Sequence, residues 1–328
     1  MHLSVIIPAL DEADTLPLLL GQLRAQTGIE IEIIVADGGS RDETPVLAKN
    51  RGARVVVAQR GRAAQMNAGA AHSRAGFLLF LHADSRLPSP TFLADALRAL
   101  QAAGGAKIAG HFPLRFARMG PAHDFFYRYL EGKTRSNRPH TINGDQGLLI
   151  SREYFTELGG FDASLPFMED QRISARIFVT GRWIVLPGEL TTSARRFEAE
   201  GHAERLTLMA LMTGAQVVGL MEFFSAAPEI YRAQGQTQRL DPAPFARRAR
   251  RLMRAQGRQG LRTLYRGGGF VRENAWQLFY RRDLLRNDGC SSALDFHDRW
   301  FAPTMNNVFG NLLGTLLLWL WLLKISLS

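Results

Sequence analysis

Four short apolar runs, separated by stretches with helical spacing, dominate the first hundred residues of the sequence. They are rich in β-branched or aromatic residues and occupy Ser4–Ala9, Ile31–Ala36, Arg54–Ala58 and Phe77–Leu81. This alternation is typical of parallel strands, which need a crossover connection to return to the same sheet edge. We therefore expect an α/β fold with a mostly parallel, Rossmann-like sheet flanked by helices.

The later sequence changes character twice and suggests how the domains are organised. After about residue 105 longer loops appear, including a basic, polar stretch at Gly132–Asn143 that is typical of a mobile loop over a site. We expect further elements at Gly147–Ser151 (strand), Arg152–Leu158 (helix), Met168–Phe178 (helix) and Leu206–Phe224 (apolar helix). These patterns predict one domain at 1–200, with a nucleotide-binding half (1–104) and an acceptor half (105–200), and a helical extension at 201–328.

Polar residues directly follow the predicted strands, where ligands bind in open parallel sheets. Asp37 follows the second run and Asp84 the fourth. Carboxylates at these positions suit two tasks, accepting ribose hydroxyls and holding a divalent cation on a diphosphate. An isolated Asp at such a junction is about as often a helix cap. The convergence of several polar junctions on one sheet edge favours a site.

A glycine-containing segment, Arg60–Gly69, follows the third run. Gly61 permits close backbone approach, and Arg62 is suited to pair with phosphate oxygens near a helix N-terminus. An ordinary surface turn is the alternative for this segment taken alone.

Four of these motifs together resemble family 2 glycosyltransferases of the GT-A fold. They are Val5–Glu12, Asp37–Asp42, Gly61-Arg62 and His82-Ala83-Asp84, and the resemblance extends over Leu3–Phe197. It implies inverting transfer of a sugar from a UDP- or GDP-linked donor to a hydroxyl- or phosphate-bearing acceptor. The donor-binding residues that it implies are Pro8, Ala9, Glu12, Asp37, Gly39, Arg62, Gln65, Asp84 and Arg195.

The resemblance also implies a metal site, at which this sequence departs from the family pattern. Asp84 matches the last acid of an Asp-x-Asp motif that holds Mn²⁺ or Mg²⁺, whereas the first position is His82. Imidazole is a possible ligand for manganese and a poor one for magnesium. His82 is therefore either a metal ligand or a residue that supports the site without touching the metal.

Two acidic segments downstream match the acceptor side of the family. Asp170 matches the general base, and Glu169 matches its neighbour in the acceptor-site pair, with a role in catalysis or in holding the acceptor. Asp145 and Gln146 are the other acceptor-binding candidates. The alternative for the 169–170 pair is a favourable interaction with the dipole of the helix that starts there.

A narrower resemblance concerns a bacterial subgroup associated with arsenosugar biosynthesis. It rests on the His82–Asp84 terminus, the Gly61–Asn67 segment and the Gly144–Gly147 motif. The C-terminal extension is not part of the pattern of that subgroup, so a different acceptor for this chain stays an open alternative.

The C-terminal third carries much of the formal charge of +10, with twelve arginines against two acids between Arg247 and Arg286. Five of them have helical spacing and predict one cationic stripe on a single helix: Arg247, Arg251, Arg254, Arg258 and Arg262. An anionic membrane surface or plain solvation explains such a stripe. We do not expect nucleic acid as a partner, because no stacking aromatics interleave these arginines.

The final apolar run covers sixteen residues from Val308 to Leu323. A full span needs about 20 residues, so we expect this segment to lie on a membrane or be buried, rather than to cross. Trp319 and Trp321 suit a membrane boundary. We expect peripheral association with the inner face of a membrane, with a lipid-linked acceptor as one option.

The remaining features bear on compartment and on rival functions. A lone cysteine, Cys290, and an N-terminus that lacks a secretion-signal pattern favour a cytoplasmic-facing protein. A nucleotidyltransferase would need a glycine-rich, lysine-bearing loop, which Pro8–Glu12 is not. A catalytically inactive, membrane-associated GT-A scaffold is the other alternative, against which the presence of Asp84 and Asp170 argues.

Overall fold

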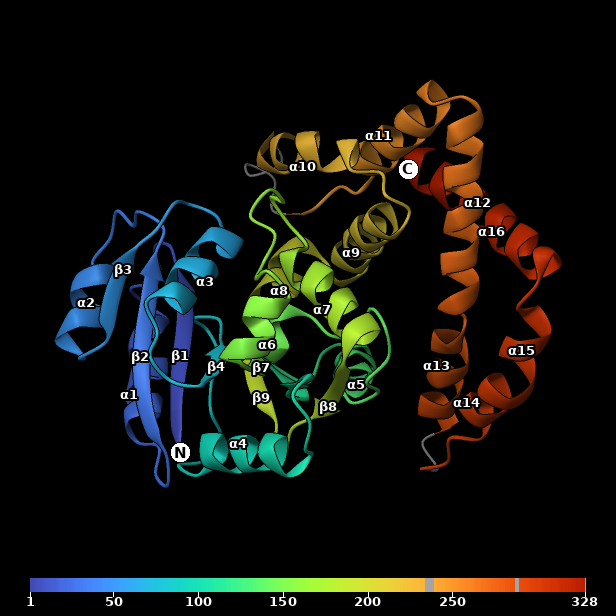
Figure 1. Ribbon diagram of the computed structural model, residues 1–328. Coiled ribbons are helices and arrows are strands. Elements are labelled where there is room, and N and C mark those ends of the chain that lie inside the picture. Colours follow the sequence, from blue (N-terminus) through green and yellow to red (C-terminus); the bar gives the residue numbers. More distant parts are fainter. Residues whose placement is uncertain (234–238, 287–288, 328) are drawn as a thin grey trace. The chain divides into compact units, whose positions relative to one another are not determined.

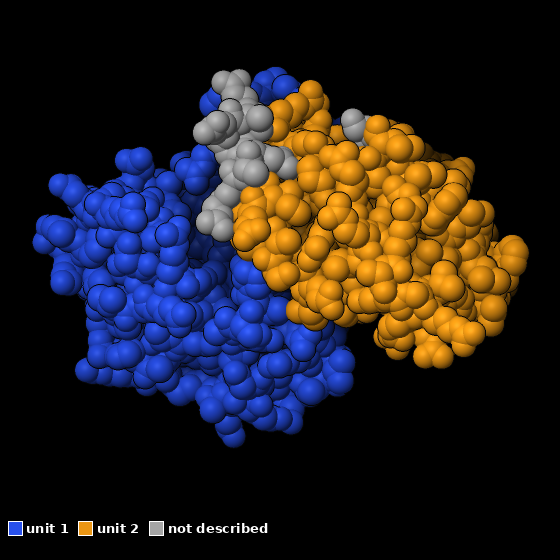
Figure 2. Space-filling view, turned by 90° about the horizontal axis from the view of Figure 1, so that it is seen from above, with its two compact units in different colours: residues 1–195 blue, residues 196–328 orange. Residues whose placement is uncertain are grey.

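The computed structural model of the chain describes residues 1–233, 239–286 and 289–327. The chain divides into two compact units, Met1–Arg195 and Arg196–Ser328, which Figure 2 shows in different colours. This division lies five residues before the boundary that the sequence suggested. Each unit is described separately below.

The first unit is built on a seven-stranded sheet with the order β3-β2-β1-β4-β7-β5-β8 (Figure 1). Its strands are β1 (His2–Ala9), β2 (Glu30–Asp37), β3 (Arg54–Val57), β4 (Phe77–Phe80), β5 (Ile108–His111), β7 (Leu148–Ser151) and β8 (Arg182–Val185). All neighbours pair in parallel except β7, which runs antiparallel to both β4 and β5. The expected mostly parallel sheet is confirmed, and the four apolar runs form its first four strands.

Helices flank this sheet because its strands are apolar on both faces. Along β1, Leu3, Val5, Ile6 and Ile7 are all fully buried. The connecting helices are α1 (Leu16–Arg24), α2 (Thr44–Asn50), α3 (Arg62–Ala71) and α4 (Phe92–Ala102). Helix α3 packs directly on β1 at Gly69, where a Cβ atom would lie only 2.5 Å from Ile6 Cγ2. A side chain at this position would separate the helix from the strand.

Beyond the strands of the large sheet, residues 105–195 add a small parallel sheet and shorter helices. The added elements are β6 (Leu114–Ala117), α5 (Asp124–Lys133), the 3₁₀ turn η1 (Gly144–Gln146), α6 (Arg152–Glu157), α7 (Glu169–Thr180) and β9 (Leu190–Ser193), and α8 (Arg195–Glu200) begins at the boundary with the second unit. Part of the predicted 132–143 loop belongs to α5, and Thr141 and Ile142 are buried. The end of this segment is therefore a packed part of the fold.

In its described residues the second unit contains helices and no strand. They are α9 (His202–Val217), α10 (Glu222–Ala233), α11 (Ala243–Ala255), α12 (Arg258–Glu273), α13 (Trp276–Arg286), α14 (Ser292–Phe296), the π-helical η2 (His297–Phe301), α15 (Ala302–Met305) and α16 (Val308–Leu327).

Two helical expectations are wrong because glycines with positive φ interrupt the helices. The predicted helix at Leu206–Phe224 is two helices that are separated at Gly219, with φ of 75°. The arginine stripe is divided at Gly257, with φ of 55°, between α11 and α12. Left-handed backbone is typical of helix ends and favours glycine.

Helix α16 is longer than the sequence suggested. It runs for 20 residues through Lys324 to Leu327, with a mean hydropathy of 1.7 over a window that is 22% buried. Among the described residues it is the one helix long and apolar enough to cross a membrane. The expectation of a segment too short to span is therefore wrong.

Glycines allow α16 to pack closely against α12. A Cβ atom on Gly268 would lie 2.5 Å from Asn311 O, and Gly314 lies against the backbone of Gly268. The other side of α16 carries side chains that are 41–66% exposed: Val308, Phe309, Leu312, Leu313, Leu316, Leu317, Trp319 and Leu320. One face of the helix is thus tightly packed and the other is apolar and open.

Candidate functional site

The loops that follow β1 and β2 are joined by hydrogen bonds between them. The Arg41 amide donates to Asp11 Oδ1 at 2.7 Å, and the Asp11 amide donates to Ser40 Oγ at 3.0 Å. The Glu12 amide donates to Thr44 Oγ1 at 2.8 Å. The two predicted nucleotide loops therefore form one connected surface at the carboxyl edge of the sheet.

Asp37 ends β2 and is buried, with 4% exposure. Its carboxylate accepts hydrogen bonds from the amides of Gly39 at 3.0 Å and Ser40 at 3.2 Å, and from the Ser40 hydroxyl. Gly39 has a φ of 87°, which favours glycine. In this structure Asp37 organises the turn that follows it, but it does not cap α2, which begins only at Thr44.

Gln65 has a structural role that differs from its predicted contact with the donor. Its side chain is 4% exposed, and Nε2 donates to Ala9 O at 2.7 Å and to Ala36 O at 2.9 Å. It therefore ties together the ends of β1 and β2. Ala9 is itself buried in β1, and Pro8 is half-buried.

The end of β4 carries the two predicted metal ligands. His82 is 14% exposed, and its Nδ1 lies 2.7 Å from Asp145 Oδ1. Asp84 is half-buried, and among the described residues no hydrogen bond or ion pair engages its carboxylate. The described part of the chain holds no cluster of three or more His, Cys, Asp or Glu side chains arranged for a metal. Divalent ions at phosphate sites are commonly held by one or two side chains plus the phosphates.

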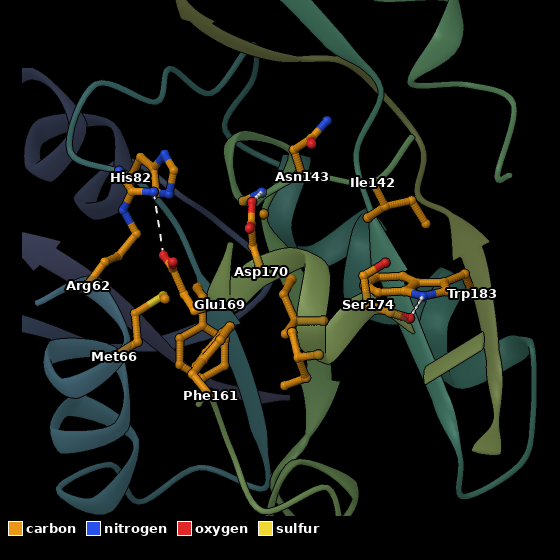
Figure 3. Close-up of a pocket in the computed structure, with 15 residues that line it drawn as sticks. Arg62, Met66, His82, Ile142, Asn143, Phe161, Glu169, Asp170, Ser174 and Trp183 are labelled. Carbon is orange, nitrogen blue, oxygen red and sulfur yellow. Dashed lines mark hydrogen bonds and ion pairs between the residues drawn. The ribbon is translucent and has the colours of Figure 1, made fainter. Parts of the chain in front are cut away.

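A pocket opens beside His82 at the carboxyl edge of the sheet (Figure 3). In this view Arg62 and His82 lie on one side, Asp170 in the middle, and Ser174 and Trp183 on the other side. Its lining residues are Arg62, Met66, Phe80, His82, Ile142, Asn143, Gly144, Gly147, Leu148, Phe161, Glu169, Asp170, Ile173, Ser174 and Trp183.

Arg62 and Glu169 form an ion pair within this pocket. Arg62 is the first residue of α3, and its Nη1 lies 3.5 Å from Glu169 Oε1. Burial raises the pKa of Glu169, the charge of Asp170 raises it further, and Arg62 partly offsets both. Burial by itself would lower the pKa of Arg62. The negative charges of Glu169, Asp145 and Asp170 outweigh this effect, and the pKa of Arg62 is raised. The pocket thus places a guanidinium beside two neighbouring carboxyl groups.

Asp170 lies in the first turn of α7 and is held by backbone amides. Its Oδ2 accepts from the Gly144 amide at 2.7 Å, and its Oδ1 accepts from the Gln171 amide at 2.7 Å. The helix-dipole interaction accounts for part of this placement. It does not explain the bond from Gly144, which belongs to a different element.

The two acceptor-site candidates before β7 have separate roles. Gln146 is fully buried, and its Nε2 donates to Thr141 O at 2.6 Å, so its side chain faces the interior and not a bound acceptor. Asp145 is half exposed and pairs with His82. The prediction of a direct acceptor contact by Gln146 is therefore wrong.

Several lining residues were missed by the sequence analysis. Trp183 on β8 and Ile142 after α5 carry no recognisable motif, because they are single apolar side chains. Phe161 follows a glycine pair, and its backbone exchanges two hydrogen bonds with the Asn67 side chain, at 2.8 and 3.0 Å. Arg195, by contrast, is exposed and is not among the lining residues.

Comparisons with known proteins identify the family of this chain. The model of the family described as "Glycosyl transferase family 2" matches residues 4–159. An uncharacterized glycosyltransferase of Mycobacterium tuberculosis (strain CDC 1551 / Oshkosh) is 30% identical over 185 residues, which cover 53% of this chain and 67% of that protein.

Another relative and one solved structure match different shares of this chain. A PGL/p-HBAD biosynthesis glycosyltransferase of Mycobacterium bovis (strain BCG / Pasteur 1173P2) is 37% identical over 91 residues, 26% of this chain. The match spans only 36% of that protein's length. The structure of a mannosyltransferase from Pyrobaculum calidifontis, in complex with GDP-Man and Mn²⁺, has a TM-score of 0.53 at 17% identity and covers 91% of this chain and 87% of that one. The chain has the GT-A fold and belongs to glycosyl transferase family 2.

Proposed function

We propose that the chain is an inverting glycosyltransferase that moves a sugar from a UDP- or GDP-sugar to a hydroxyl- or phosphate-bearing acceptor. The observation that supports this most is one pocket that contains both Arg62 and His82 on the donor side and Asp170 on the acceptor side. Family membership supports the same reaction class. In this proposal residues 1–104 bind the donor and residues 105–200 bind the acceptor.

The donor diphosphate is proposed to bind between α3 and the end of β4. Arg62 supplies a guanidinium, and the first amides of α3 have no partner within the helix. Asp84 and His82 fit a divalent cation, because the Asp84 carboxylate has no partner among the described residues and His82 has Nε2 unbonded. When bound, the cation neutralises the charge that develops on the leaving diphosphate. The mannosyltransferase structure was determined with such a donor and Mn²⁺.

Asp170 is proposed to remove the proton from the acceptor hydroxyl as that oxygen attacks the anomeric carbon. Inversion needs a base on the face opposite the leaving group. Two backbone amides hold the Asp170 carboxylate in place, so its orientation does not depend on a flexible partner. Glu169 is buried beside Arg62. In this proposal it holds the acceptor side of the pocket in place and, together with Arg62, sets the charge around Asp170.

Membrane association is proposed through the second unit. The five arginines of the divided stripe, at 247, 251, 254, 258 and 262, are all exposed. Helix α16 is 20 residues long, and its open face is apolar. Basic side chains and interfacial tryptophans favour contact with an anionic leaflet. We propose that the chain associates with the cytoplasmic face of a membrane, where a lipid-linked acceptor would be within reach.

A nucleotide-release assay tests the catalytic proposal. The purified chain is incubated with a panel of UDP- and GDP-sugars with Mn²⁺ or Mg²⁺, and released nucleotide is measured. Release from one donor class is expected, and Asp84→Asn should lose metal-dependent donor binding. Absence of release or transfer from every donor would favour the inactive scaffold.

Flotation with vesicles tests the membrane proposal separately. The chain should float with anionic vesicles at low salt. A chain that stays wholly in the soluble fraction would refute membrane association without touching the catalytic proposal.

A further inference from the structure

The reversed direction of β7 delivers an additional element to the catalytic edge of the sheet. The residues that precede an antiparallel strand lie at the edge where its parallel neighbours end. The turn η1 precedes β7, and β7 pairs with β4, so η1 lies beside the end of β4. The chain segment 144–146 therefore contacts His82 although more than sixty residues separate them.

This turn contacts both halves of the proposed site. Asp145 Oδ1 lies 2.7 Å from His82 Nδ1, and the Gly144 amide donates to Asp170 Oδ2 at 2.7 Å. One turn thus fixes the imidazole on the donor side and the carboxylate on the acceptor side.

The turn itself is anchored on the side away from the pocket. Gln146 is buried, its backbone carbonyl accepts from the Phe112 amide at 2.9 Å, and its side chain holds Thr141 O. Gln171 Nε2 donates to Asn143 Oδ1 at 2.8 Å. Asp145 therefore projects from a fixed backbone.

The contact with Asp145 decides which ring nitrogen of His82 is left for a ligand. A carboxylate next to Nδ1 favours the proton there, which leaves the lone pair on Nε2. His82 Nε2 lies close to Gly144, on which a Cβ atom would be 3.0 Å from Nε2 and 3.3 Å from Asp170 Oδ2. The free nitrogen thus faces the pocket side of the turn, where glycine leaves space.

We propose that Asp145 is a positioning residue that orients His82, through Nδ1, so that Nε2 binds the divalent cation together with Asp84. This inference rests on the proposed function. Outer hydrogen-bond partners of a ligating histidine typically change metal affinity by about 10- to 100-fold. In this proposal the effect of Asp145 on the cation passes through His82, so its contribution to Mn²⁺ affinity disappears when His82 is absent.

Mn²⁺ affinity in the presence of UDP or GDP, measured by electron paramagnetic resonance, tests the inference in a mutant cycle. Asp145→Ala should weaken Mn²⁺ binding about 10- to 100-fold. Asp145→Asn keeps an acceptor oxygen and should lose less. In the His82→Ala background, Asp145→Ala should have no further effect. Asp95→Ala, an exposed acid on α4 that pairs with Arg98, is the matched control.

The outcomes separate this inference from the proposed function. Unchanged Mn²⁺ affinity in Asp145→Ala, or an equal loss with and without His82, would overturn the positioning role. Wild-type transfer and Mn²⁺ binding would then still support the glycosyltransferase proposal. A wild-type chain that binds no Mn²⁺ with either nucleotide would overturn both. Metal-free nucleotide affinity equal to wild type shows that each variant is folded.

Discussion

The close packing of α12 against α16 makes two adjacent glycines respond in opposite ways to the same change. A Cβ atom on Gly268 would lie 2.5 Å from Asn311 O and 2.5 Å from Thr315 N, both backbone atoms that no side-chain rotation can move. On Gly269 the nearest atom would be the Asn311 side-chain oxygen at 3.5 Å, an ordinary contact distance. Gly268→Ala and Gly269→Ala are therefore a matched pair.

The expected magnitude follows from two terms. Replacing glycine by alanine inside a helix stabilises it by about 1 kcal/mol, and both variants gain this. Overpacking costs roughly 1–3 kcal/mol, and only Gly268→Ala incurs it. The gain cancels in the comparison, so the free energy of unfolding should be lower for Gly268→Ala than for Gly269→Ala by about 1–3 kcal/mol.

The assay combines denaturant unfolding with hydrogen exchange in peptides from α12 and α16. The second readout is needed because the chain has two units, and a whole-chain transition need not be two-state. Gly268→Ala should lose protection in both helices while Gly269→Ala keeps or gains it. Equal stability and protection in the two variants would refute the close helix contact.

Three further predictions concern the site and the membrane face. Asp170→Asn should slow transfer by about 10² to 10⁴ with donor affinity unchanged, and near-normal turnover would remove Asp170 as the base. The raised pKa of Glu169 means that the folded state holds its proton more tightly than the unfolded state, so wild-type stability relative to Glu169→Gln should fall as pH rises above 4.5. Unfolding curves of both proteins across pH 4 to 8 check this, and a constant difference contradicts it. A chain that ends before Val308 should lose flotation with anionic vesicles, and undiminished flotation would exclude α16 as the contact.

The first four strands could be predicted because each is a short run rich in apolar residues, although only β1 and β4 are largely buried along their length and the edge strand β3 is not. β5 was missed, since its sequence Ile108-Ala109-Gly110-His111 contains a glycine and a histidine. The direction of β7 has no signature in its composition. Without that direction the sequence could not show that Asp145 contacts His82.

The same distinction applies to the site residues, because local motifs could be predicted and contacts between distant segments could not. The sequence placed Arg62, His82, Glu169 and Asp170 in one site, and the structure brings them to one pocket. Whether a polar side chain binds a ligand or a buried carbonyl depends on its rotamer and on segments distant in the chain. For this reason ligand contacts were predicted for Gln65 and Gln146, although both side chains donate hydrogen bonds to backbone carbonyls.

The second unit was harder to predict because single residues decide where its helices end. Gly257 interrupts a pattern of arginines that would otherwise fit one helix. Lys324 seemed to end the apolar run, but the helix continues past it. A single charged side chain near a helix end is compatible with a longer apolar helix.

The hydrogen bonds that join the loops after β1 and β2 have a consequence for engineering donor choice. Asp11 contacts Arg41 and Ser40, and Glu12 contacts Thr44. Grafting only one of these loops from a relative would leave the partner loop with mismatched donors and acceptors. The two segments are a single exchangeable module, and variants made by recombination should inherit them together.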